Sequence, residues 1–289
     1  MKFTSVVSYH TNVLTCGVAR FNQELARRLN IPMVPYEDGR TWGAFPLLSL
    51  KFSEMSFRPM AGLNRRFGVL WHDEGYAPLT QVATFVMFGD PSLGSPAAWC
   101  PPVIPDLPKH VSSQMRIFTC GMAHKLDAAP YVRLRELLDA TPHTAQLRLS
   151  VAVHEGTSLT DAELHFGALK TNMGRHVVAV LGCLTDEAMA RELKKALAVT
   201  AFYAKGVRAN NTTAHAAMSQ GRALITNLDA DSPKDFIHND TCFDIHQMTA
   251  WPTLAEIDRV AKNGRELYES TYDWIHLVDR IGELCANSR

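Results

Sequence analysis

A polar stretch in the C-terminal half places hydrogen-bonding groups at the expected start of a helix. Residues 206–227 read GVRANNTTAHAAMSQGRALITN, a polar loop followed by a short alanine-rich helix, a glycine and an apolar strand. The backbone N–H groups at a helix start and the positive end of its dipole suit an anion such as a phosphate. The side chains available there are those of Asn210, Asn211, Thr212 and Thr213. An ordinary Asn/Thr cap without a ligand is the alternative.

A second group of polar residues follows the predicted strand in FTCGMAHK. Lys125 is the kind of cation that binds a diphosphate, and His124 precedes it. In parallel α/β sheets, ligands bind at the carboxyl ends of strands. Both residues are therefore candidate anion contacts, with ordinary solvated surface side chains as the alternative.

Two further clusters, in WHDEG and SVAVHEGTSL, also follow predicted strands. A histidine or a carboxylate at such a position could orient a hydroxyl group that takes part in a reaction. We take His72, Asp73 and Glu155 as candidate catalytic residues. His154 and Gly156 flank Glu155 and are candidate ligand contacts. Polar turns without a chemical role are the alternative for both clusters.

Signatures of several other chemistries are absent from the sequence. There is no GxSxG nucleophile elbow, no GxxxxGK[ST] phosphate loop and no GxGxxG dinucleotide fingerprint. HEGTS is not an HExxH zinc helix, because Ser158 stands where the second histidine would be. No spaced His/Cys set suggests a metal, and we predict neither a metal nor a bound cofactor. A glycoside hydrolase, which needs two facing carboxylates, stays open.

Composition favours a globular protein of the cytoplasm. The 289 residues are 46% hydrophobic and 20% charged, and Lys plus Arg equals Asp plus Glu at 29 each. Because the net charge is zero, no overall field draws the chain to nucleic acid. The six cysteines are scattered without a CxxC pair, as in reduced cytosolic proteins. We expect no signal peptide, since MKFTSVVSYHT turns polar early, and no transmembrane segment.

The elements that must position these residues alternate between apolar runs and amphipathic helices, which is typical of parallel α/β domains. Strands are predicted at KFTSVVSY, FGVLWH, TFVMFGD, RIFTCGM, LRLSVAV, HVVAVLG, AVTAFYA and RALITN. Helices are predicted at GVARFNQELARRLN, APYVRLRELLDA, TDEAMARELKKAL, the alanine-rich stretch of residues 206–227, TLAEIDRVAKNGRELYES and YDWIHLVDRIGELC. A Thr/Asp cap is predicted at the start of TDEAMARELKKAL, at Thr185 and Asp186, and Thr253 and Glu256 form a predicted capping box.

The proline-rich segment CPPVIPDLPKH reads as a linker between two domains. We predict an N-terminal domain over residues 1–108, a C-terminal domain over 109–270, and a last helix over 271–289 that crosses back to the first domain. The predicted fold class is therefore α/β, with two tandem Rossmann-like parallel-sheet domains.

Several motifs together resemble the GT-B retaining glycosyltransferases of the family 4 type. NTTAHAAMSQGRALITN resembles the family's donor-binding segment, with Ala217, Met218 and Gly221 in register. FTCGMAHK, VLGCLTDEAM, CGVARFNQELARRL and TYDWIHLVDRI resemble further motifs of that family, and they occur in the family's order. The resemblance covers most of residues 113–285 and the front of the chain.

This resemblance implies two domains that face a cleft and transfer a sugar from a nucleoside-diphosphate sugar without a metal. The implied donor-binding residues are Gly17, Gly121, His124, Lys125, His154, Gly156, Leu184, Arg208, Asn210, Asn211, Thr212 and Thr213. The implied partner is a nucleotide-sugar donor. The acceptor is open among a glycan, a lipid-linked intermediate and a small molecule, with nucleic acid less expected at zero net charge.

One departure from the family concerns its usual pair of glutamates, which would fall at Arg208 and Ala216. Neither residue is acidic, so the roles of those carboxylates are absent or moved, and Arg208 offers a cation instead. The sequence therefore leaves two hypotheses: a glycosyltransferase, or a non-catalytic protein of the same fold that binds a nucleotide sugar or a protein partner.

Overall fold

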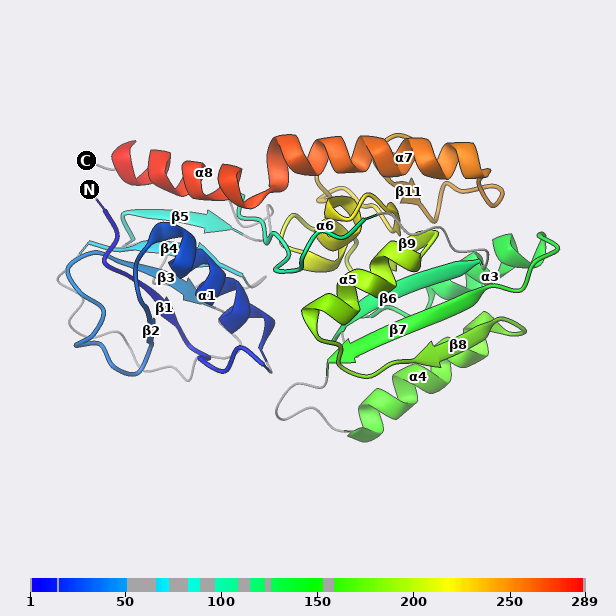
Figure 1. Ribbon diagram of the computed structural model, residues 1–289, viewed down its shortest axis with the longest axis horizontal. Helices are drawn as coiled ribbons and strands as arrows, with labels where there is room; N and C mark the ends of the chain where they lie inside the picture. The colour runs from blue at the N-terminus through cyan, green and yellow to red at the C-terminus, as the bar shows by residue number, and fades with distance from the viewer. Residues whose placement is uncertain are drawn as a thin grey trace. The chain divides into compact units, whose positions relative to one another are not determined.

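The chain forms two compact α/β units (Figure 1). The computed structural model describes residues 2–14, 16–50, 66–72, 83–88, 97–108, 115–122, 126–152 and 159–287. Unit 1 comprises residues 1–103, 208–210 and 272–289, and unit 2 comprises residues 104–207 and 211–271. The chain thus first leaves unit 1 within the proline-rich segment.

Unit 1 is built on a five-stranded parallel sheet with the order β2-β1-β3-β4-β5. Its strands are β1 (Ser5–Ser8), β2 (Met33–Pro35), β3 (Pro46–Leu50), β4 (Gly68–Trp71) and β5 (Phe85–Phe88). Every residue of β1 and β4 is buried, which a parallel sheet covered on both faces requires.

Helices α1 (Gly17–Leu29) and α8 (Trp274–Asn287) pack together in unit 1 (Figure 1). Phe21 of α1 stacks on Trp274 of α8 with ring centroids 5.2 Å apart, and Arg28 lies over the same indole. The Trp274 indole N–H also donates to Pro102 O at 3.0 Å. These contacts join the end of the chain to the helix that follows the first strand.

Unit 2 is built on a six-stranded parallel sheet with the order β11-β10-β9-β6-β7-β8. Its strands are β6 (Arg116–Met122), β7 (Gln146–Ala152), β8 (Val177–Val180), β9 (Ala198–Ala201), β10 (Ala223–Thr226) and β11 (Phe243–Asp244). Its helices are α3 (Pro130–Asp139), α4 (Leu159–Met173), α5 (Asp186–Lys195), α6 (Thr212–Ser219) and α7 (Leu254–Leu267), and a π-helix at Tyr268–Tyr272 follows α7. The prediction of two parallel-sheet α/β domains is confirmed.

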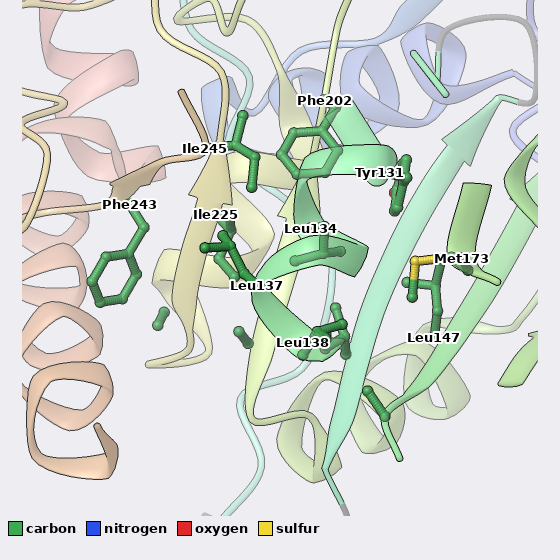
Figure 2. Close-up of a cluster of buried hydrophobic side chains, with 14 of the residues drawn as sticks. Tyr131, Leu134, Leu137, Leu138, Leu147, Met173, Phe202, Ile225, Phe243 and Ile245 are labelled. Carbon is green, nitrogen blue, oxygen red and sulfur yellow. The ribbon is translucent and has the colours of Figure 1, made fainter. Parts of the chain in front are cut away.

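The core of unit 2 lies between α3 and the sheet (Figure 2). Leu134 and Leu138 of α3 are fully buried in the same cluster as Leu147 of β7 and Ile225 of β10. Because the apolar residues of α3 recur at helical spacing, one face of the helix covers the sheet. Because α3 covers the face of the sheet, the loops that connect strands and helices lie at the strand ends.

Helix caps in unit 2 follow the sequence prediction. Thr185 accepts a hydrogen bond from the Ala188 N–H at the start of α5, and Thr253 and Glu256 form a complete capping box at the start of α7. Among the helices of the described segments, none has the length and apolar character that crossing a bilayer requires.

Asp106 joins the segment at the start of unit 2 to the C-terminal end of α6. Its carboxylate oxygens lie 2.9 Å from Lys194 Nζ and 3.0 Å from Arg265 Nη2. Lys194 also donates to Gln220 O at 3.1 Å, and Arg265 donates to Ser219 O. Burial alone would raise the pKa of the Asp106 carboxyl, but the hydrogen bonds and charges of Lys194 and Arg265 outweigh burial and lower this pKa.

Replacing Asp106 with asparagine should lower the free energy of unfolding at about pH 7 by at most about 1 kcal/mol, because water screens partly exposed ion pairs. The Asp106 side chain is 56% exposed. Since its pKa is lowered in the folded protein, the carboxylate stabilises the fold above its unfolded-state pKa, and this contribution is lost as pH falls through the folded-state pKa. In denaturant titrations the difference between wild type and Asp106→Asn should therefore shrink from about pH 7 to about pH 3.

The exposed Asp279 of α8 provides the matched control. Asp279→Asn should cost little stability at either pH. A stability difference for Asp106→Asn that persists at about pH 3 would contradict the assigned role of the ion pairs.

Candidate functional site

The carboxyl end of β6 and the first turn of α6 lie together in unit 2. Gly121 of β6 has φ +151°, a conformation that side-chain-bearing residues rarely adopt. A Cβ atom added there would lie 4.0 Å from Thr213 Oγ1. The structure therefore brings together two residues that the sequence analysis predicted as donor contacts.

The hydroxyl of Thr213 is used inside the protein. Its Oγ1 donates to Cys120 O at 2.8 Å, and the Cys120 Sγ lies 3.7 Å from the same oxygen. A threonine hydroxyl has one hydrogen, so this donation takes the proton that a phosphate oxygen would need. Thr213 can therefore offer an anion its backbone N–H but not its hydroxyl proton.

The first turn of α6 presents backbone N–H groups. Asn211 is the N-cap residue with φ −80° and ψ 95°, and its side chain makes no capping hydrogen bond. Ala214 N and His215 N both donate to Asn211 O, so the helix's own hydrogen bonding starts at those two residues. The N–H groups of Thr212 and Thr213 lie outside it, as expected for a helix start, and Thr212 is exposed. The Asn211 side chain therefore does not act as a hydrogen-bonding cap of α6.

The loop that enters α6 is held in place by the end of β10. Asn227 Nδ2 donates to Tyr203 O at 2.6 Å, and Tyr203 N donates to Asn227 Oδ1 at 3.0 Å. Gly206 has φ +74°, and a Cβ atom there would lie 2.8 Å from the Asp229 carboxylate. Asn227 and Tyr203 were not predicted from the sequence, although Asn227 is a polar residue directly after an apolar strand, which was the available signal.

Leu184 lies in the loop between β8 and α5. It is half-buried and precedes Thr185, the capping residue of α5. The start of this loop is tied to β7, because Ser150 Oγ donates to Gly182 O at 3.1 Å. Leu184 therefore follows the carboxyl end of β8, the outer strand beside β7.

In unit 1, His72 follows β4 and its ring is buried. Ser49 Oγ lies 2.8 Å from Nε2, Cys100 Sγ lies 3.7 Å from Nδ1, and the Phe21 ring meets the imidazole edge-on at 5.4 Å. Both ring nitrogens therefore have protein atoms beside them. The His72 carbonyl accepts a hydrogen bond from Asn210 Nδ2 at 3.2 Å. This environment gives His72 a packing role, while its predicted catalytic role stays a prediction.

The remaining predicted residues of unit 1 lie at separate places. Gly17 begins α1, and a Cβ atom added there would meet no heavy atom within 4 Å. Arg208 is buried, and it belongs to unit 1 together with Asn210. The polar loop before α6 is therefore split between the units: residues 208–210 belong to unit 1, and Asn211 and the residues after it belong to unit 2.

Six predicted site residues lie outside the part of the chain that the structure describes: Asp73, His124, Lys125, His154, Glu155 and Gly156. Their predicted roles stay predictions. Within the described ranges, no group of three or more His, Cys, Asp and Glu side chains is arranged to hold a metal ion.

No known protein family and no curated protein matches the sequence. Solved structures are similar over nearly the whole chain. Sucrose-phosphate synthase from Thermosynechococcus elongatus is 13% identical, with 99% of each chain covered and a TM-score of 0.68. A glycosyltransferase from Rickettsia africae is 7% identical, with 99% of this chain and 98% of that chain covered and a TM-score of 0.61. HepE from Anabaena, solved in complex with UDP, is 12% identical, with 99% and 100% covered and a TM-score of 0.60.

The fold is that of GT-B glycosyltransferases. At these identities the similarity concerns the fold alone, because one fold supports many activities. The membership of family 4 that the motifs suggested stays a prediction.

Replacing His72 with alanine should lower the free energy of unfolding by about 1–3 kcal/mol. The reason is that the buried Ser49 hydroxyl would lose its hydrogen bond to the His72 ring. Ser49 is 1% exposed. Ser49→Ala removes one hydrogen bond without a large cavity and should cost less. Denaturant titration measures both. A His72→Ala protein as stable as the wild type would show that the ring is not part of the packing.

Proposed function

We propose that the protein transfers a sugar from a nucleoside-diphosphate sugar to an acceptor. The observation that carries this proposal is the first turn of α6, which offers the N–H groups of Thr212 and Thr213 at the carboxyl edge of a parallel sheet. The GT-B fold supports it, since a structure of that fold contains UDP.

The chemistry needs fixed hydrogen-bond donors for the departing diphosphate. Sugar transfer passes through an oxocarbenium-like state while negative charge builds on the phosphate oxygens. In our proposal the N–H groups of α6 and the exposed Thr212 hydroxyl receive that charge, and Gly121 leaves the diphosphate room beside β6. Lys125 and His124 are proposed to add positive charge. We propose that this donor set works without a metal and that the sugar is transferred with retention.

The acceptor side of the proposal concerns the polar residues that follow β4 and β7 in the sequence. Because the His72 ring already has Ser49 and Cys100 beside its nitrogens, Asp73 and Glu155 are the better candidates to orient an acceptor hydroxyl. The acceptor class is proposed to be a glycan, a lipid-linked intermediate or a small molecule. A cytoplasmic location is part of the same proposal.

A second candidate function is binding without catalysis. Arg208 and Ala216 stand where the family resembled in sequence has its glutamates, and both are buried, at 8% and 5% exposure. Neither supplies a carboxylate to a sugar. This observation favours a protein that binds a nucleotide sugar and leaves it intact.

A thermal-shift screen against UDP-, GDP-, ADP- and dTDP-sugars tests donor binding. A ligand at about 100 times its dissociation constant adds roughly 2.7 kcal/mol of stability, which raises the melting temperature measurably. We expect one nucleotide class to give this shift, with or without excess EDTA. Absence of any shift would remove the donor site. Release of the nucleoside diphosphate only in the presence of an acceptor would distinguish transfer from binding without catalysis.

Thr212→Ala should weaken binding of the stabilising nucleotide about tenfold, because a hydrogen bond to a charged group is lost. The melting temperature of the ligand-free protein should change little, since Thr212 is exposed. Thr253, the cap of α7, is the matched control: Thr253→Ala should cost about 0.5–2 kcal/mol of stability and leave affinity unchanged. Calorimetric titration decides the matter, and unchanged affinity in Thr212→Ala would exclude its hydroxyl from the site.

A further inference from the structure

Strand β8 forms one edge of the sheet of unit 2, and all its side chains are apolar (Figure 1). Among the residues that the structure describes, it is the last strand of the sheet order, and only β7 pairs with it. Val177 is 49% exposed and Val180 is 42% exposed. An exposed apolar edge strand is a template for pairing with another strand.

The two exposed valines lie on opposite faces of the sheet. Val180 stands opposite Leu149 of β7, which belongs to the core cluster of unit 2. Because side chains alternate along a strand, Val177, three positions earlier, points to the other face. A helix packed on one face would cover one of these valines, whereas a strand added beside β8 would cover both.

The backbone of β8 also presents hydrogen-bonding groups on its outer side. Val177 N donates to Ala145 O at 3.1 Å, and Leu181 N donates to Leu149 O at 2.7 Å, both toward β7. Backbone groups alternate in direction along a strand, so the N–H and C=O groups of residues 178 and 180 face away from β7. An added strand would pair with these two residues.

The other edges of the two sheets differ from β8 in ways that discourage pairing. At the opposite edge of the same sheet, β11 has only two residues, both buried, and one of them is Asp244. In unit 1, the edge strand β2 ends in Pro35. Short length, charge and proline are features that keep edge strands from pairing. β8 has neither a charge nor a proline.

We propose that β8 pairs with β8 of a second copy of this chain, antiparallel and around a twofold axis at Ala179. In this register Val178 of each copy faces Val180 of the other, and each such pair exchanges two backbone hydrogen bonds. Val177 of each copy faces Leu181 of the other. The two Ala179 residues form a non-hydrogen-bonded pair, in which Cα atoms approach to about 4.5 Å. This inference goes beyond the proposed function and does not depend on it.

The sequence of the strand suits a copy of itself. Residues 177–181 read VVAVL, so every position meets an apolar residue when the strand is reversed. The smallest side chain, that of Ala179, falls at the axis, where the two strands are closest. Cross-strand pairs of β-branched residues stabilise a sheet. A twofold contact of this kind closes on itself and stops at a dimer.

The charges at the two ends of β8 are complementary. At its amino end, Arg135 and Arg175 share one carboxylate, that of Asp139. At its carboxyl end, Asp186 and Glu187 occupy the first turn of α5. Antiparallel pairing sets the basic end of one copy beside the acidic end of the other, which favours this arrangement over a parallel one.

The first test is sedimentation velocity of the full chain over a range of concentrations. Two short strands form a small interface, so we expect a reversible dimer that forms between about 5 and about 500 μM. A protein that stays monomeric over this whole range would overturn the inference.

Val180→Pro tests the backbone pairing. The proline removes an N–H that faces away from β7, and edge strands tolerate proline at such positions. Each dimer loses two hydrogen bonds, so its dissociation constant should rise at least about tenfold. An unchanged dissociation constant in a variant that melts near the wild-type temperature would exclude β8 from the interface.

Substitutions of Val177 test the charge arrangement. Val177→Glu brings a carboxylate to the acidic end of the other copy and should weaken the dimer more than Val177→Lys does. Ile237, which is also 49% exposed, is the matched control in unit 2, and Ile237→Glu should dimerise as the wild type does. Equal effects of Val177→Glu and Ile237→Glu would contradict the proposed interface.

Cysteine crosslinking tests the register and also serves if Val180→Pro fails to fold. The exposed Cys183 is first replaced by serine. With a mild oxidant, Ala179→Cys should give a disulfide-linked dimer, because a Cα separation of about 4.5 Å lies within disulfide range. Val177→Cys should stay unlinked despite its greater exposure, since the two copies of residue 177 lie about 13 Å apart along the strand. Stronger crosslinking of Val177→Cys than of Ala179→Cys would overturn this pairing.

Discussion

Parallel strands cannot be joined by tight turns, and each connection must cross a face of the sheet before the next strand begins. In both units this constraint puts the carboxyl ends of the strands and the starts of the following helices at one edge. Because of this geometry, the Cys120 carbonyl of β6 meets the Thr213 hydroxyl of the first turn of α6 near that edge. The core between α3 and the sheet consists of buried hydrophobic side chains (Figure 2).

At the carboxyl edge of the sheet of unit 2, several polar side chains of the described residues bond within the protein. Asn227 completes the backbone hydrogen bonding of Tyr203, Thr213 bonds to Cys120, and Thr226 bonds to Ala201. A buried polar group without a partner costs stability, so these bonds are conditions of folding. Among the described residues of this edge, the backbone N–H groups at the start of α6 and the exposed Thr212 hydroxyl are available to a ligand. The same division holds in unit 1, where Asn22 donates to Ser8 and Ser49 lies beside His72.

The start of α6 presents N–H groups, whereas Arg208 and Ala216 replace the two glutamates of the family that the sequence resembles. Diphosphate recognition by N–H groups does not need acidic residues, whereas recognition of sugar hydroxyls commonly uses hydrogen-bond acceptors. Under the proposed function, this site would bind the diphosphate as in the family, whereas its choice of sugar would differ. Arg208, counted with unit 1 although the chain around it belongs to unit 2, adds a buried cation to that unit.

The sequence alone determined the features that depend on local signals. The apolar run of β6 was predicted with its observed bounds of Arg116–Met122, and the caps of α5 and α7 were predicted from neighbouring residues. The short strands β2, β3 and β11 and the helix α4 were not predicted from the sequence. The three residues of β2 have no pattern of their own and form a strand only because Val6 to Ser8 pair with them. The predicted fold class was correct, since alternation of elements is readable without contacts.

Only the tertiary structure decided which polar atoms are free to meet a ligand. Thr212 and Thr213 are adjacent and chemically alike, yet Thr213 bonds to Cys120, 93 positions away, and Thr212 faces solvent. His72 and Asp73 are adjacent candidates for catalysis in the sequence, and only the structure shows that Ser49 and Cys100, 23 and 28 positions away, lie at the His72 ring nitrogens. Hydrogen bonds over such separations leave no periodicity or spacing in the sequence, because they depend on how the strands are ordered in the sheet.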